Sequence, residues 1–418
     1  MLLVPEIDLT DPELPHDPAA VYGRARERAP VARLLAPGFG PMWAVTRHAE
    51  ARSMLSDARF ANGAASYQRP DVPEHCRRFM RTMQEMDGPE HQRLRRLSAP
   101  GFTARRAAAF RPAVERIVGR LLDGVADRLL DGPVDLLEAF AGPLPMEVIC
   151  ELVGVPDADR PAWLVHGRAV AAGNGPAFMA AVPAIIDGAR AAAPHVAGMF
   201  GDGLTEEELI TLVWHLVLAG QTPVNLIANA VATLLEDPAR AELLRAEPDL
   251  LPGAVEELTR WCGPQLLTIP RYVRHPTDLA GVTVGPGEPV TAALVAVNRD
   301  PRVFPDPERL DLRSTAAGAH LGYAHGPHFC LGAPLARVQT EVAIGALLAR
   351  FPDLALSDAP ELAGVAARRV PDPGTWRLAA LPVVASVLSC AAAPLPGLVA
   401  GKDGAAVPAV AGNDPGRP

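Results

Sequence analysis

Residues 321–337 have the sequence Leu-Gly-Tyr-Ala-His-Gly-Pro-His-Phe-Cys-Leu-Gly-Ala-Pro-Leu-Ala-Arg. Glycines at 322, 326 and 332 and prolines at 327 and 334 predict a constrained loop that runs into a helix over 331–350. Cys330 lies at the start of that helix, where backbone N–H groups and the helix dipole favour a thiolate. A thiolate is a soft, electron-donating ligand for a redox-active metal. An isolated cysteine is more often buried and inert, so the loop around Cys330 is what favours a metal ligand.

Composition narrows the class of protein. The chain has 418 residues, is 49% hydrophobic and carries a net charge of -9, which argues against a nucleic-acid partner. Its five cysteines, at 76, 150, 262, 330 and 390, are odd in number and contain no CxxC pair, so they do not form a disulfide framework. The N-terminus lacks a basic flank, and no apolar run approaches the roughly 20 residues of a membrane span. We therefore expect a cytoplasmic protein with no membrane or nucleic-acid partner.

Helical patterning dominates the chain, over 105–130, 205–236, 253–261 and 331–350. Thr205 followed by Glu208 predicts a capping box at the start of the second segment. Residues 268–297 predict short strands around a turn. The fold class is thus mainly α with small β-sheets, in one domain over 1–383, and the Ala/Pro/Gly-rich residues 384–418 are expected to form a disordered tail. No GxGxxG or GxxxxGK[ST] motif is present, so electrons for any redox chemistry would come from another protein.

The run Gly326-x-His328-x-Cys330-x-Gly332 resembles the haem-binding loop of the cytochrome P450 family, and residues 333–337 continue as in its soluble bacterial members. The resemblance covers about residues 10–383. It implies a single triangular, mainly helical domain in which Cys330 is the axial ligand to the iron of haem b (heme b, iron protoporphyrin IX). Thiolate ligation favours O–O cleavage. The usual Phe-Gly is replaced by Tyr323-Ala324, which adds a hydroxyl near the sulfur that could shift the redox potential.

A second motif, Glu257-x-x-Arg260, is followed by residues 296–301 and then by Phe304-x-x-Pro307-x-Arg309. Spacing of three puts Glu257 and Arg260 on one helix face, although such pairs are usually exposed when they occur alone. The order of the motifs resembles the P450 core. It implies that Glu257, Arg260 and Arg309 form a buried charge triad with a structural role.

Haem carries two propionates, so its protein needs fixed cations. Residues 87–96 resemble the family's helix over the haem edge, and the spacing of His91 and Arg95 places them on one face. The resemblance implies that Arg271 and His328 also contact propionates. A solvated basic helix face remains the alternative for residues 91–96.

The central helix departs from the family pattern. Members usually carry Ala-Gly-x-acid-Thr there, whereas residues 218–226 are Leu-Ala-Gly-Gln-Thr-Pro-Val-Asn-Leu, one residue short. Gln221 then replaces the acid and Thr222 keeps the hydroxyl, or else Thr222 replaces the acid and Pro223 the threonine. We prefer the first alignment and take Thr222 and Gln221 as the catalytic candidates. Proline should also kink the helix.

His215, Ala219 and Thr222 fall at i, i+4 and i+7 on one face of this helix. If Thr222 faces the haem, His215 and Ala219 could line the substrate cavity. A histidine packed in the core is the alternative.

The resemblance implies a haem-thiolate monooxygenase that oxidises a small organic molecule, of the kind made in specialised metabolism, with O2 and electrons from a ferredoxin-type donor and its reductase. A basic docking patch could be formed by Arg93, Arg96, Arg105 and Arg106. Residues 60–86 and 160–200 are expected to shape the substrate cavity. Oxidative coupling or peroxide-driven oxidation on the same fold is an alternative, and a non-catalytic haem-binding or sensor protein is a third.

Overall fold

The structure is a computed structural model that describes residues 4–36, 39–66, 72–172, 176–357, 369–370, 372 and 374–386. Of the predicted tail, only 384–386 are among them, and the remainder, with Cys390, lies outside the described residues.

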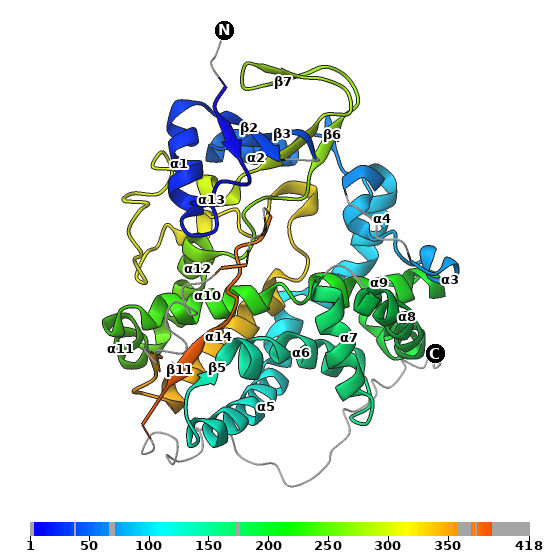
Figure 1. Ribbon diagram of the computed structural model, residues 1–418. Helices are drawn as coiled ribbons and strands as arrows, with labels where there is room; N and C mark the ends of the chain where they lie inside the picture. Colours follow the sequence, from blue (N-terminus) through cyan, green and yellow to red (C-terminus); the bar gives the residue numbers. More distant parts are fainter. Residues whose placement is uncertain are drawn as a thin grey trace, which may run out of the picture.

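Helices form most of the described chain, and the longest of them lie together in the half of the molecule opposite the N-terminus (Figure 1). In chain order they are α1 Pro18–Arg28, α2 His48–Ser56, α3 Glu74–Arg77, α4 Gly88–Ser98, α5 Ala104–Leu129, α6 Pro143–Val153, α7 Arg160–Ala172, α8 Pro176–Val196, α9 Glu206–Ala219, α10 Pro223–Leu235, α11 Pro238–Ala246, α12 Leu251–Cys262, α13 Leu294–Val297 and α14 Ala333–Arg350. The predicted helices over 105–130, 253–261 and 331–350 are confirmed as α5, α12 and α14. The mainly α fold class is confirmed with them.

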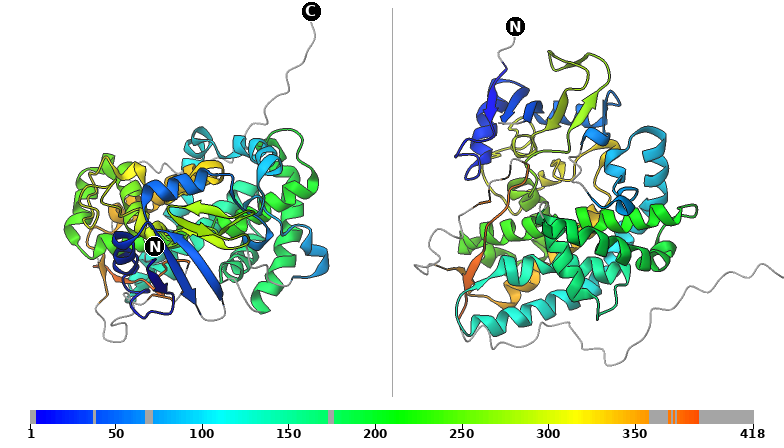
Figure 2. Two further views of the ribbon diagram at one scale, coloured as in Figure 1. Left: turned by 90° about the horizontal axis from the view of Figure 1, so that it is seen from above. Right: turned by 45° about the vertical axis from the view of Figure 1, so that its right-hand side comes forward.

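The strands form one six-stranded mixed sheet and two small sheets at the narrower end of the molecule and along the helical layer (Figures 1 and 2). The large sheet has the order β1-β2-β3-β9-β6-β4, with bounds Glu6–Asp8, Val31–Ala36, Phe39–Val45, Pro289–Ala292, Arg271–Val273 and Phe60–Ala61. The small sheets pair β7 Thr277–Leu279 with β8 Val282–Val284, and β11 Pro382–Val384 with β10 Ala355–Leu356 and β5 Val134–Asp135. The strands predicted over 268–297 are therefore confirmed. Helix α2 packs on the large sheet through Ala51, Met54 and Leu55.

The central helix is interrupted at Gly220–Thr222, between α9 and α10. Its first turn has the predicted capping box: Glu208 N–H donates to Thr205 Oγ1 at 3.2 Å, and Thr205 N–H donates to Glu208 Oε2 at 2.9 Å. Pro223 has no N–H to donate and begins α10. The expected kink is therefore a full break.

By length and mean hydropathy alone, the stretch Glu206–Leu235 could span a membrane, contrary to the expectation that no run reaches that length. Half of its most apolar window is buried inside the fold. Packing against neighbouring helices explains its apolar composition, because a core helix is hydrophobic on several faces.

Glu257 and Arg260 form a buried, two-pronged ion pair on α12. Arg260 Nε and Nη2 donate to the two Glu257 carboxylate oxygens, both at 2.7 Å. Arg260 also donates to the backbone carbonyls of Asn298 at 3.1 Å and Pro307 at 3.0 Å, while Glu257 Oε1 accepts from Asp311 N–H at 3.0 Å. The pair thus holds the irregular segment 298–311 against α12.

The predicted side-chain triad with Arg309 is wrong. Arg309 contributes its backbone carbonyl, which accepts from Arg260 Nη2 at 3.0 Å, while the Arg309 side chain is exposed. A backbone oxygen satisfies the last donor of Arg260 without adding a second buried charge, which would repel the first.

We expect Glu257→Ala to lower the free energy of unfolding by about 3–5 kcal/mol, because the change leaves the Arg260 charge buried without its partner. Urea unfolding measures the loss. The matched control is Glu247→Ala, which removes the partner of Arg313 in an exposed pair and should cost about 1 kcal/mol or less. Equal small losses in the two variants would contradict a structural role for the buried pair.

Candidate active site

The loop before α14 is fixed by its backbone. Cys330 N–H donates to the Tyr323 carbonyl at 2.9 Å, and Phe329 N–H donates to the Gly326 carbonyl at 3.0 Å. Gly326 has a φ of 73°, and a Cβ there would lie 2.7 Å from the Leu55 carbonyl oxygen at the end of α2. Only glycine permits both this conformation and this approach. The loop is thereby seated on α2.

Cys330 lies three residues before Ala333, the first residue of α14. Of the four cysteines among the described residues, it is the exposed one, and Cys76, Cys150 and Cys262 are buried. Surrounding protein raises the pKa of the Cys330 thiol by desolvation, whereas the N–H groups of Gly332 and Ala333 and the charges of Arg95 and Arg337 favour the thiolate. Cys330 is therefore an exposed residue whose thiolate form has stabilising groups nearby.

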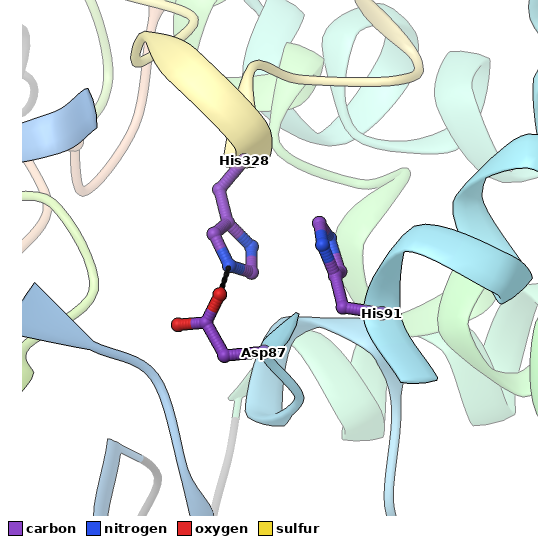
Figure 3. A group of neighbouring side chains, drawn as sticks. All are labelled: Asp87, His91 and His328. Atoms are coloured by element: carbon purple, nitrogen blue, oxygen red, sulfur yellow. Dashed lines mark hydrogen bonds and ion pairs between the residues drawn. The ribbon is translucent and has the colours of Figure 1, made fainter. Parts of the chain in front are cut away.

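Two histidines stack beside this loop (Figure 3). The rings of His91, from α4, and His328 have centroids 4.1 Å apart and planes inclined by 25°. His328 Nε2 lies 3.3 Å from Asp87 Oδ1, which helps to hold the pKa of the Asp87 carboxyl low against the opposing effect of burial. Burial lowers the pKa of His91 to about 4, and the neighbouring charge of His328 acts in the same direction. His91 is therefore neutral at pH 7 in this arrangement.

Two arginines complete the cluster. Arg271, on β6, is 4% exposed and donates from Nη1 to the Leu55 carbonyl at 2.7 Å, and burial lowers its pKa to about 10. Arg95 is half-buried and donates from Nη2 to the Phe329 carbonyl. Within the described ranges, neither guanidinium forms an ion pair with a carboxylate. Buried cations without counter-ions are unfavourable, so the cluster suits an anionic ligand.

The structure thus brings together the five residues predicted to hold haem: His91, Arg95, Arg271, His328 and Cys330. Ligand atoms of Asp87, His91 and His328 lie within 4.8 Å of one another, a spacing that a metal ion could bridge. The charges of Arg95 and Arg271 disfavour a cation there, because both already depress the pKa of His91.

Thr222 and Gln221, in the break of the central helix, differ in burial and in hydrogen-bond partners. Thr222 is half-buried, and its hydroxyl donates to the Ala219 carbonyl at 3.0 Å. Gln221 is 7% exposed and donates from Nε2 to the carbonyls of Gly167 at 2.8 Å and Val217 at 3.1 Å. Both amide hydrogens are bonded to carbonyl oxygens, which gives the Gln221 side chain a structural role, and its catalytic role stays a prediction.

His215 is half-buried, and Ala219, one turn further along α9, is half-buried as well. Burial lowers the pKa of His215 to about 4, so the imidazole is neutral. Among the described residues it has no hydrogen-bond partner. These observations are compatible with a position on a cavity wall, the role predicted for His215 and Ala219.

The predicted basic patch is smaller than expected. Arg93 pairs with Glu208 at 2.6 Å and donates to the Gly203 carbonyl at 2.9 Å, which ties α4 to the start of α9. Arg96, Arg105 and Arg106 are exposed, at the end of α4 and the start of α5. Arg93 is thus removed from the patch.

Comparison with known proteins identifies the family. A cytochrome P450 family model matches residues 244–355. The chain is 40% identical over 364 residues to the cytochrome P450 monooxygenase PikC of Streptomyces venezuelae, covering 82% of this chain and 86% of that protein. It is 38% identical to the mycinamicin IV hydroxylase/epoxidase of Micromonospora griseorubida, covering 81% and 89%. The structure of the bacillaene polyketide synthase P450 PksS from Bacillus subtilis 168 superposes with a TM-score of 0.79 at 30% identity, covering 90% and 98%.

The chain belongs to the cytochrome P450 family. It is therefore a monooxygenase, and its relatives use haem iron and take electrons from redox partners to oxidise small molecules. The predicted single domain of this family is confirmed.

Two departures of this P450 lie behind Cys330. The Tyr323 hydroxyl is buried near Thr259, and burial raises the pKa of Tyr323 to about 12. Ala324 has a φ of 59°, in the left-handed region that favours glycine. The alanine is therefore strained where the family usually has glycine.

Sequence reasoning missed a group of side chains beside Tyr323. Arg337 lies over the Tyr323 ring at 4.6 Å and pairs with Glu256 at 2.6 Å, and His320 Nε2 lies 3.3 Å from the same carboxylate. Burial alone would raise the pKa of Glu256, but His320 and Arg337 outweigh it and lower the value to about 2. Arg337 closes the haem-loop run and could have been singled out there. Asp87 was also missed, although it opens the motif that holds His91.

Ala324→Gly should raise the free energy of unfolding by about 1 kcal/mol, because it removes the left-handed strain of an alanine. Thermal and urea unfolding of the haem-loaded protein measure the gain. The matched control is Ala191→Gly on the exposed face of α8, where the same change should cost about 1 kcal/mol. If both variants lose stability, the strain at Ala324 is refuted.

Proposed function

We propose that this P450 binds haem b through Cys330 and hydroxylates or otherwise oxidises a small organic molecule of specialised metabolism. The observation that carries the proposal is the accessible Cys330 thiol beside two arginines and two histidines without sufficient counter-charge. A planar dianion with an iron centre matches this set of groups. The relatives named above include a mycinamicin IV hydroxylase/epoxidase and a bacillaene polyketide synthase P450, which supports the substrate class.

In this proposal each residue of the cluster has a defined task. The Cys330 thiolate would be the ligand to the haem iron, and the N–H groups of Gly332 and Ala333 would moderate the charge on its sulfur. Arg271, Arg95, His91 and His328 would hold the haem propionates. Neutral His91 acts as a hydrogen-bond donor, and its stacking on His328 fixes the ring orientation.

When bound, haem iron supplies the activation of dioxygen that the side chains of a protein cannot perform. The protons that this chemistry needs would be delivered by side chains of the protein. Thr222 donates its own proton to the Ala219 carbonyl, so its oxygen is left as an acceptor and can order a water molecule. We assign the proton relay to Thr222 and that water, without participation of Gln221.

The electron donor is proposed to be a ferredoxin with its reductase, and the compartment the cytoplasm. Arg96, Arg105 and Arg106 offer exposed positive charge for an acidic donor, although the chain as a whole is acidic. Phe329, 39% exposed next to Cys330, offers an apolar contact close to the sulfur.

The substrate is proposed to be predominantly apolar with a few hydrogen-bonding groups. The relatives include the mycinamicin IV hydroxylase/epoxidase, the 6-deoxyerythronolide B hydroxylase and the vitamin D(3) 25-hydroxylase. His215 and Ala219 would line the cavity, with α7, α8 and residues 72–86 as its outer wall. His215 would then be the polar contact on an otherwise apolar helix face.

Peroxide-driven oxidation is the second candidate, because residues 218–226 lack the usual carboxylate. Product formation with hydrogen peroxide alone, at a rate equal to that with NADPH and redox partners, would favour it.

Cys330→Ala should abolish the red-shifted Soret band of the reduced carbon monoxide complex, because that band requires thiolate ligation. The measurement is the carbon monoxide difference spectrum of purified protein, together with haem content by pyridine haemochrome, which also identifies haem b. Cys76→Ala, at a buried cysteine, is the control and should keep the band. A band that persists in Cys330→Ala would refute the ligand assignment.

Thr222→Ala should leave haem binding intact but lower the product formed per NADPH consumed, with hydrogen peroxide formed instead. A positioned proton relay contributes typically about 10²–10⁴-fold to rate. Product, NADPH and peroxide are measured together, first with 6-deoxyerythronolide B as the test substrate. Thr222→Ser keeps the hydroxyl and should retain most of the coupling. Unchanged coupling in Thr222→Ala would remove Thr222 from the relay and favour the alignment in which Pro223 replaces the threonine.

A further inference from the structure

The break between α9 and α10 leaves backbone carbonyls that side chains satisfy. Pro223 offers no N–H to Ala219, so the Ala219 carbonyl accepts from Thr222 instead, through its N–H at 3.4 Å and its hydroxyl at 3.0 Å. The Val217 carbonyl accepts from Gln221 Nε2 at 3.1 Å. Gln221 thus closes the last turn of α9 with its side chain.

The same amide nitrogen also reaches a second helix. Gln221 Nε2 donates to the Gly167 carbonyl, in the middle of α7, at 2.8 Å. A Cβ on Gly167 would lie 2.7 Å from Met146 Sδ and 3.5 Å from Gln221 Nε2. The absence of a side chain at Gly167 therefore lets α7 approach α6 and the helix break closely enough for this hydrogen bond. It joins two segments 54 residues apart in the sequence.

Thr222 has little freedom of its own once this bond is made. It follows Gln221 directly, and Pro223 after it has a fixed φ. Both the N–H and the hydroxyl of Thr222 are bonded to one carbonyl, that of Ala219. The side-chain hydrogen bonds of Gln221 hold its backbone in one orientation. Only three residues separate Ala219 from Pro223, so a change in that orientation would also rotate Thr222.

We propose that Gln221 is a positioning residue, which ties α7 to the break in the central helix and so sets the direction of the Thr222 hydroxyl. The inference rests on the proposed function, in which that hydroxyl faces the haem. In this inference Gln221 acts through Thr222 and not directly on the substrate, because both of its amide hydrogens are bonded to backbone carbonyls. It also makes α7, which packs on α8 and α9, an element whose position affects the relay.

The test uses Gln221→Met, which keeps the length of the side chain and removes its donors, and Gln221→Glu, which keeps its shape and cannot donate when ionised. The matched control is Gln92→Met, at an exposed glutamine on α4. Thr222→Val serves as the reference for loss of the hydroxyl. All variants are compared as haem-loaded, full-length protein.

Two measurements separate positioning from simple stability. The infrared stretching frequency of carbon monoxide on the reduced haem reports the polar group nearest to the iron. Amide hydrogen exchange over 160–172 reports the attachment of α7, and loss of one buried hydrogen bond should raise exchange there by roughly tenfold. We expect both Gln221 variants to shift or split the carbon monoxide band as Thr222→Val does, with faster exchange in α7. Gln92→Met should match the unaltered protein in both measurements.

The inference is overturned if Thr222→Val shifts the band while both Gln221 variants leave it in place, whatever happens to exchange in α7. It is also overturned if none of the three variants shifts the band, because Thr222 would then not face the iron. Failure of the proposed function is recognised separately, by the absence of bound haem or of the thiolate band in the unaltered protein. If one Gln221 variant does not fold, the other decides.

Discussion

The hydrogen bonds of the buried Arg260 guanidinium are the interaction on which the loop before α14, residues 321–332, depends. A guanidinium that is 5% exposed requires a partner for each N–H, and Glu257 supplies only two acceptors. The remaining donors bind backbone carbonyls of the irregular segment 298–311. A segment with little regular structure of its own is thereby fixed in place by one side chain.

That constraint passes directly to the active site. Asn298, whose carbonyl accepts from Arg260, uses its side-chain oxygen to accept from Leu321 N–H at 2.7 Å, at the start of the haem loop. Elsewhere in the loop, Gly326 packs against the Leu55 carbonyl at the end of α2, and Arg271 donates a hydrogen bond to the same carbonyl oxygen. The loop is thus held from α12 on one side and from α2 on the other. In the proposed function this rigidity matters, because a small displacement of the Cys330 sulfur would change its bond to the iron.

The sequence predicts features that depend on local spacing and fails where distant neighbours decide. The i, i+3 pair of Glu257 and Arg260, the capping box of Thr205 and the loop before Cys330 are each encoded within a few residues. Arg93 instead pairs with Glu208, 115 residues away, which no spacing rule indicates. Arg309 likewise contacts Arg260 through its backbone carbonyl and leaves its side chain exposed, which the sequence does not indicate. For the haem-edge cluster, the required charge was predictable, whereas the stacking of His91 on His328 was not.

The motif in the central helix is one residue shorter than the family pattern, and the contacts of Gln221 explain why a carboxylate would not fit at that position. An acid at Gln221 would face the carbonyls of Gly167 and Val217, where a carboxylate is repelled and an amide donates. The side chain before Thr222 is therefore an amide whose position suits a donor and not a carboxylate. Pro223 fits this geometry, because the break already leaves its position without a backbone donor. The hydrogen bonds of Gln221 and Thr222 and the missing N–H of Pro223 are thus consistent with one another, and they fit the alignment that we prefer, in which Thr222 keeps the hydroxyl.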